Sequence, residues 1–177
     1  MAWIKTKTPE LLTAEELRRR FSYDPETAAW TRTVAASSKF RTGSVTFGWR
    51  EHGDRRRRVI DVCGQRHRVH RLAWLYMTGA WPNGPVDHIN GDEGDNRWRN
   101  LRLATDAQNS QNCRVRRHSR TGLKGVVPYG NSGRYIVQLR VNGKQVRIGG
   151  LFDNPIMAAV WHHAFAQLAY GEYARAV

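Results

Sequence analysis

One stretch of the chain, residues 86–112, constrains the fold more than any other. It holds two short segments of strand length, VDHI at 86–89 and LRLA at 101–104. Between them lies a polar segment, 91–94, whose glycines predict a reversal of the chain. After the second run, capping residues introduce a helix over about 107–115. The stretch therefore predicts two strands followed by a helix.

The same stretch carries side chains that suit phosphodiester hydrolysis. Asp87 and His88 are adjacent, and neighbours on a strand point to opposite sides, so they can have separate roles. The carboxylate and the amide oxygens of spaced asparagines can hold one hard cation. A free imidazole can take a proton from water while a further group orients it. An Asp–His pair alone is common in buried turns, so the prediction of a compact nuclease site depends on the whole spacing.

The order DHxxG, DNR, NLR and N within this stretch resembles the ββα-metal motif of HNH endonucleases, in the phage homing-endonuclease variety. Three flanking segments match too, namely YDPET at 23–27, HRLAW at 70–74 and TGAWP at 78–82. The resemblance covers about residues 20–115. It implies a site-specific endonuclease that nicks or cuts duplex DNA. The alternative is a DNA-binding regulator whose HNH module has only a structural role.

The resemblance also implies a role for each site residue. His88 is the general base, and Asp87 and Asn109 are the ligands of one divalent metal. Asn100 is expected to hold the His88 ring through its carboxamide oxygen. Many HNH nucleases have a histidine at the position of Asn109, and the oxygen ligands here favour Mg²⁺ or Mn²⁺ over zinc. The sequence leaves open whether Asn112 assists or replaces Asn109. No organic cofactor is expected.

The chain is strongly basic, with a formal net charge of +14 in 177 residues, and 24 of its 29 basic residues are arginine. The guanidinium group of arginine can form two hydrogen bonds at once with a phosphate or with the edge of a guanine. Duplex DNA is therefore the expected partner, ahead of RNA or an anionic membrane. No apolar stretch approaches the roughly 18–20 residues of a membrane span, and the N-terminus lacks a signal-peptide pattern. Cys63 and Cys113 lack zinc-type spacing. We expect a protein of the bacterial cytoplasm, encoded by a phage or mobile element, monomeric by default with a dimer as the alternative.

Arginine gathers in two further places. Residues 55–58 are four consecutive arginines leading into a hairpin expected over 56–70, and 114–120 holds four more in a linker. An arginine run alone often marks a solvated surface, but beside a nuclease site it becomes a candidate phosphate track. His70 lies at the start of a helix expected over 71–78. A core or capping role is the favoured interpretation of this histidine, and a functional role is the alternative.

The last third of the chain predicts a second module. Three strands, at 123–128, 134–141 and 144–152, precede a helix of about fifteen residues that Gly171 closes. The apolar positions of this helix, expected to pack on the sheet, are Met157, Val160, Trp161, Ala164, Phe165 and Leu168. The polar face of the central strand is left to solvent or DNA.

This module resembles the apetala/ethylene-response-factor DNA-binding domain. The matching segments are GLKGV at 122–126, RY at 134–135, GGLF at 149–152 and the alanine-containing helix that ends in GEYA at 171–174. The resemblance covers about residues 119–176. It implies a sheet that lies in the major groove, with arginines reaching bases and phosphates.

The expected fold class is α+β. A ββα-metal nuclease domain spans residues 1–118, and a small three-stranded antiparallel sheet packed on one helix spans 119–177. Candidate DNA contacts come from both modules and from the linker. They are Arg56, Arg58, Arg97, Arg114, Arg116, Arg117, Arg120, Arg134, Gln138, Arg140, Lys144 and Arg147.

Overall fold

The computed structural model describes residues 12–35, 42–44, 48–52, 55–113, 115 and 118–174. The chain divides into two compact units, Met1–Leu103 and Ala104–Val177. Both contain helices and small antiparallel sheets, which confirms the α+β class. The division at Leu103 comes before the boundary expected at residue 118. The helix that follows the two strands of the predicted ββα motif therefore belongs to the second unit, and the functional boundary stays a prediction.

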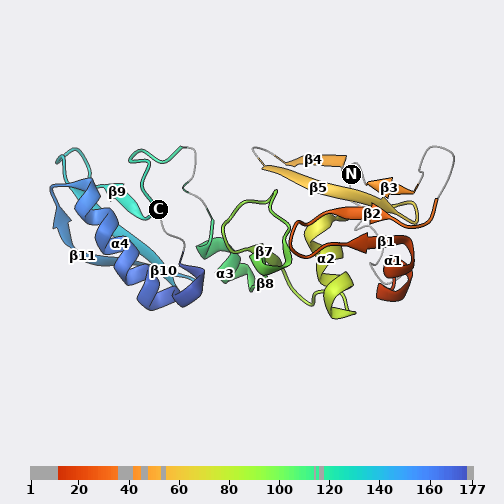
Figure 1. Ribbon diagram of the computed structural model, residues 1–177. Helices are drawn as coiled ribbons and strands as arrows, with labels where there is room; N and C mark the ends of the chain where they lie inside the picture. Colours follow the sequence, from red (N-terminus) through yellow and green to blue (C-terminus); the bar gives the residue numbers. More distant parts are fainter. Residues whose placement is uncertain are drawn as a thin grey trace, which may run out of the picture. The chain divides into compact units, whose positions relative to one another are not determined.

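The first unit begins with helix α1, Ala14–Arg20, and a three-stranded sheet in the order β1-β2-β3 (Figure 1). Thr13 caps the helix and accepts a hydrogen bond from the backbone of Glu16 at 3.1 Å, as its sequence predicts. The strands are short and span Phe21–Tyr23, Trp30–Arg32 and Gly43–Ser44.

A second sheet in this unit contains the predicted arginine-rich hairpin. Its strands β4, β5 and β6 span Gly48–His52, Arg55–Val62 and Gln65–Arg68. Val62 pairs with Gln65 across a tight turn, so the hairpin is confirmed. Helix α2, Val69–Thr78, follows directly and ends at Gly79, whose left-handed backbone (φ 82°) donates to the carbonyl of Leu75.

The core of the first unit lies between α1, α2 and the sheets. Leu17, Phe21 and Leu72 are fully buried there, and the rings of Tyr23 and Trp30 pack at a tilt with centroids 4.9 Å apart. Against this core the chain forms the hairpin of β7, Val86–His88, and β8, Leu101–Leu103. A loop and a short 3-10 turn, η2 at Trp98–Asn100, connect the two strands. The rigid core therefore supports the strand that carries the Asp–His pair.

The second unit starts with helix α3, Asp106–Gln111, which ends four residues earlier than its sequence predicts. A capping box at Thr105 and Gln108 fixes its first turn. The sheet has the order β11-β10-β9, with strands Val126–Pro128, Tyr135–Val141 and Lys144–Phe152. Helix α4, Pro155–Tyr170, lies across it and leads into the 3-10 turn η3, Gly171–Tyr173 (Figure 1).

The face that α4 turns to the sheet differs from the predicted one. Its buried residues are Ala158, Ala159, His162 and Ala166. Met157, Val160, Trp161 and Leu168, expected in the core, are between 42% and 83% exposed. Small alanines let the helix lie close to the strands, and a Cβ on Gly125 would come within 2.0 Å of the His162 ring. Close packing of small residues, rather than the bulky stripe, determines the rotation of the helix.

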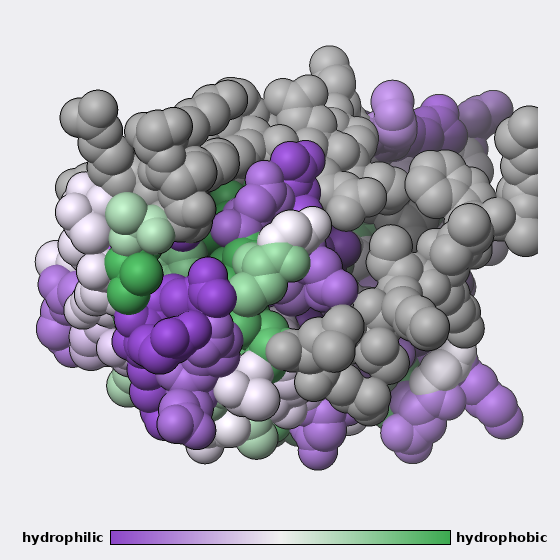
Figure 2. Space-filling view, turned by 90° about the vertical axis from the view of Figure 1, so that its right-hand side faces the viewer, coloured by the Kyte–Doolittle hydropathy of each residue, from purple (hydrophilic) through white to green (hydrophobic). Residues whose placement is uncertain are grey.

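Much of the described surface is hydrophilic. Figure 2 views the first unit from its α1 side and shows hydrophilic side chains over broad areas, with smaller hydrophobic areas between them. Helix α1 contributes exposed Arg18 and Arg19. Among the described residues, no helix has both the length and the apolar character that crossing a membrane requires.

Candidate active site

Asp87 and His88 lie on β7, paired in register with Arg102 and Leu101 of β8. Each is only 6% exposed, so both are buried although they project to opposite sides of the strand. Buried polar groups are expensive unless they are hydrogen-bonded, and the surroundings of both residues supply partners.

The imidazole of His88 contacts the side-chain carboxamide of Asn96, which lies in the loop between β7 and β8. His88 Nε2 lies 3.2 Å from Oδ1 of Asn96, a residue that is 1% exposed. The backbone carbonyl of Asn96 accepts a hydrogen bond from the hydroxyl of Tyr23 at 2.7 Å. Asn96 belongs to the DNR segment of the sequence motif. The sequence alone, however, does not show that this carboxamide and not a neighbouring one contacts His88.

Asn100 does not make the expected contact with the His88 ring. Its amide nitrogen donates to Asn90 Oδ1 at 3.0 Å and to the carbonyl of Asp95 at 2.7 Å. Its amide oxygen accepts from the backbone N–H of Asn90 at 3.0 Å. The structure therefore corrects the expectation, because Asn100 fastens the loop between β7 and β8 and Asn96 contacts the ring.

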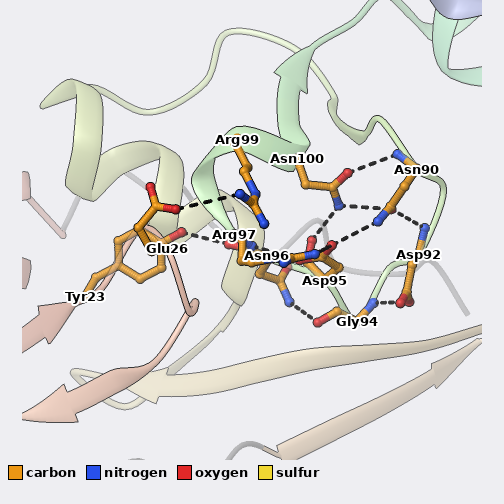
Figure 3. A network of polar contacts seen from close by, with 10 residues as sticks. All are labelled: Tyr23, Glu26, Asn90, Asp92, Gly94, Asp95, Asn96, Arg97, Arg99 and Asn100. Carbon is orange, nitrogen blue, oxygen red and sulfur yellow. Dashed lines mark hydrogen bonds and ion pairs between the residues drawn. The ribbon is translucent and has the colours of Figure 1, made fainter.

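The same loop is braced by an acidic residue (Figure 3). Arg97 donates to both carboxylate oxygens of Asp95, at 2.7 and 2.6 Å, and Asn90 donates a further bond at 2.9 Å. Hydrogen bonding by Arg97 lowers the pKa of Asp95 to about 2. Arg97, a candidate DNA contact, is thus held in the structure by an ion pair that shapes the loop.

A second histidine packs against His88. His70, at the start of α2, is 7% exposed, and its ring lies edge-on to that of His88 with centroids 5.2 Å apart. Burial lowers its pKa well below the ordinary value, and the neighbouring His88 and arginines act in the same direction. His70 is therefore neutral at ordinary pH. Its burial agrees with the favoured interpretation of His70 as a core residue. Because its ring also contacts His88, His70 belongs to the candidate site as well.

Asp87 is the proposed metal ligand, and its carboxylate is paired with Arg102. Nη2 and Nε of Arg102 lie 3.1 and 3.2 Å from Oδ2 of Asp87, and both side chains are at most 10% exposed. A buried carboxylate oxygen is a hard donor and fits Mg²⁺ or Mn²⁺. A divalent cation at Asp87 would compete with the guanidinium for that oxygen. Across the described ranges, no three His, Cys, Asp or Glu side chains gather as a metal-binding group.

The two other candidate ligands belong to the second unit. Asn109 is half-buried on α3, and its carbonyl accepts a weak bond from the Cys113 thiol at 3.4 Å. Asn112 is the C-cap residue of the same helix and is 4% exposed. The ligand roles of both residues stay predictions from the sequence motif.

The other candidate DNA contacts fall into three groups. In the first unit, Arg58 is half-buried on β5, and the side chain of Arg56 lies outside the described residues. In the linker, Arg114, Arg116 and Arg117 also lie outside them. In the second unit, exposed Arg120 and Arg134 line an open groove of about 520 Å³.

The register of β10 and β11 determines which side chains share the polar face of the sheet. Gln138 pairs with Arg147 and Arg140 pairs with Gln145, so these four side chains lie on one face. Arg147 extends over the ring of Tyr129, with its guanidinium carbon 5.5 Å from the ring centroid. Lys144, another candidate DNA contact, pairs with Val141, which puts it on the face opposite to Arg140.

Comparison with known families gives one result. The model of the HNH endonuclease family matches residues 67–111, which include β7, β8, the intervening loop and α3. No curated protein and no solved structure gives a match. The match covers 45 of 177 residues and supports an HNH nuclease built on a ββα core.

Proposed function

We propose that this protein is a site-specific DNA endonuclease of the HNH type, in which His88 is the general base that activates water. The observation that carries the proposal is the environment of His88. Its ring is buried on the strand that also carries Asp87, contacts Asn96 and packs on His70, within the segment that matches the HNH endonuclease family. A histidine held in this way is oriented to accept a proton from water.

HNH nucleases generally use a divalent metal, and we propose Mg²⁺ or Mn²⁺ because the candidate ligands are hard oxygens. When bound, the metal acts as a Lewis acid that stabilises the charge developing on the phosphate and the leaving oxygen. Asp87 would hold it, and Asn109 is the second proposed ligand on the strength of its position in the motif alone. His88 then takes the proton of the attacking water.

The second unit is proposed to bind the duplex through its polar sheet face. Gln138, Arg140 and Arg147 share that face and can reach base edges or phosphates, as in the ethylene-response-factor domains that the module resembles. Arg120 and Arg134, beside the groove, are candidate phosphate contacts. We further propose a homing-type enzyme of phage origin that acts in the bacterial cytoplasm, monomeric by default.

One observation favours a second candidate function, a DNA-binding regulator with a non-catalytic HNH module. The Asp87 carboxylate is paired with the guanidinium of Arg102, which balances its charge within the protein itself. The two functions differ in what they predict for cleavage and for metal binding. A regulator binds DNA with no dependence on Mg²⁺, whereas the nuclease binds the cation and breaks the backbone.

The deciding experiment incubates the protein with supercoiled plasmid carrying the flanking DNA of its own gene, in Mg²⁺ or Mn²⁺. Nicked or linear product that EDTA abolishes, and that the His88→Ala variant does not make, supports the nuclease. Binding in a gel-shift assay with intact plasmid under all of these conditions supports the regulator. Strand-resolved mapping of the ends then distinguishes a nick from a double-strand cut.

A further inference from the structure

We propose that Asn96 is the positioning residue for the general base, holding His88 with its hydrogen on Nε2 and its lone pair on Nδ1, and that Tyr23 in turn holds Asn96. This inference deepens the proposed function and rests on it. It assigns to Asn96 the role that the sequence motif implied for Asn100.

The orientation of the Asn96 carboxamide follows from its two ends. Its nitrogen donates to the carbonyl oxygen of Gly94 at 3.1 Å. A carbonyl can only accept, so the amide nitrogen must face Gly94 and the amide oxygen must face His88.

The orientation of the carboxamide decides where the histidine carries its hydrogen. The amide oxygen of Asn96 only accepts hydrogen bonds, so Nε2 of His88, 3.2 Å away, must be the donor. A neutral imidazole has one N–H, and with the hydrogen on Nε2 the basic lone pair lies on Nδ1. Nδ1 is therefore the atom that takes the proton from water.

Tyr23 fixes the backbone from which this carboxamide extends. Its hydroxyl donates to the Asn96 carbonyl at 2.7 Å from strand β1, and the tyrosine is 5% exposed. Its ring packs on Trp30 and Tyr76, with centroids 4.9 and 5.8 Å away. Burial raises the pKa of Tyr23, so the hydroxyl keeps its proton and remains a donor at any pH at which the enzyme would work.

The two asparagines of the loop thus have different tasks. Asn100 fastens the backbone of the loop through Asn90 and Asp95, whereas Asn96 contacts the imidazole itself. His70 packs against another part of the same ring. We infer that the packing of His70 restricts the orientation of the His88 ring, whereas Asn96 determines which nitrogen of that ring carries the hydrogen.

Two substitutions separate a positioning role from a merely structural one. Asn96→Leu keeps the approximate shape but removes the acceptor, and we expect it to lower the single-turnover cleavage rate about tenfold or more while leaving DNA affinity unchanged. Asn96→Asp restores an oxygen facing Nε2 and should recover most of the rate. A purely structural role predicts that Asp is no better than Leu, because the carboxylate faces the Gly94 carbonyl without a hydrogen to donate.

Asn90→Leu provides the matched control. It removes a carboxamide from the same loop, whose hydrogen bonds are made to Asp95 and Asn100 and not to the His88 ring. Nitrogen-15 NMR of the histidine side chains in the DNA-free protein reads the proton position directly. We expect His88 to carry its hydrogen on Nε2 in the wild type and in Asn90→Leu, with the proton protected from exchange. That protection should be lost in Asn96→Leu.

The inference is overturned if wild-type His88 carries its hydrogen on Nδ1, or if Asn96→Leu cleaves at the wild-type rate. The NMR spectrum of the wild type needs no variant, so it decides the matter even if Asn96→Leu does not fold. Tyr23→Phe, which removes one hydroxyl and keeps the ring packing, adds a milder test with a smaller loss of rate. Failure of wild-type protein to cleave at all would refute the nuclease function, whereas the proton position would still be measured.

Discussion

The loop between β7 and β8 and the sheet of the second unit are both rich in polar side chains, but they use them differently. In the loop, Asn96 and Asn100 are buried and hydrogen-bonded. On the sheet, Arg140 and Arg147 are exposed, and their partners are a turn carbonyl and an aromatic ring. Fixed geometry suits chemistry, where a displaced base is ineffective, and exposed arginine suits the tracking of a flexible duplex. Substitutions in the two regions should therefore affect different measured quantities.

The largest expected effect concerns His88. A general base contributes about 10²–10⁴-fold to rate, so His88→Ala should lose most single-turnover cleavage and keep its DNA affinity. Quench-flow or gel-based cleavage at saturating enzyme measures the rate, and fluorescence anisotropy measures binding. Cleavage within a few-fold of wild type would remove His88 from the mechanism and break the contrast between the two regions.

The next effect concerns the proposed metal ligand. Asp87→Asn should abolish cleavage in Mg²⁺ and weaken Mn²⁺ binding in calorimetry, with partial recovery in excess metal, because a neutral amide is a poorer ligand than a carboxylate. Asn is chosen over Ala because its amide oxygen can still accept hydrogen bonds from the buried Arg102, whereas Ala would remove that acceptor altogether. Undiminished wild-type cleavage in EDTA would contradict the metal-dependent mechanism.

The sheet should respond in affinity. Arg140→Ala and Arg147→Ala are each expected to weaken DNA binding by about 1–3 kcal/mol if they reach bases, with the cleavage rate at saturating enzyme unchanged. Lys144→Ala is the matched control, because the register puts Lys144 on the opposite face. Equal losses for all three variants in gel-shift titrations would indicate a general charge effect and not recognition by one face.

The smallest effect concerns the stability of the loop at acid pH. The pKa of Asp95 is lowered from 3.8 to about 2, so its contribution to folding is fully present above about pH 4 and is lost as pH falls through about 2. Thermal melts of wild type and Asp95→Asn between pH 2 and 5 should converge at the acid end. A constant difference in melting temperature across that range would show that the Arg97 pair does not stabilise the fold.

Local signals in the sequence predicted local structure well. Thr13 caps α1, β5 and β6 form the expected hairpin, and the expected helix of the last third forms as α4, capped by Asn154 with Pro155 as its first residue. Each depends on a few neighbouring residues, and tertiary packing does not need to be known. The HNH segment was likewise recognisable from spacing, and the family match at residues 67–111 supports it.

The sequence did not predict features that depend on packing in three dimensions. The bulky stripe of α4 gave the wrong buried face, because the contact with Gly125 and the strands is made by alanines and His162. Asn96 and Asn100 are chemically identical and four positions apart, so only the fold could show which one contacts His88. The ion pair between Asp87 and Arg102 required the register of β7 and β8.

The hydrogen bond between Tyr23 and Asn96 joins residues 73 positions apart in the chain, and this has a consequence for protein synthesis. A ribosome releases Tyr23 long before it releases the loop that Tyr23 secures. Contacts of such long range form late because closing a large loop costs entropy. In a nascent chain the His88 ring would therefore not yet be held by Asn96, and the proposed cleavage activity would begin only after the N-terminal strands and the later loop have folded together.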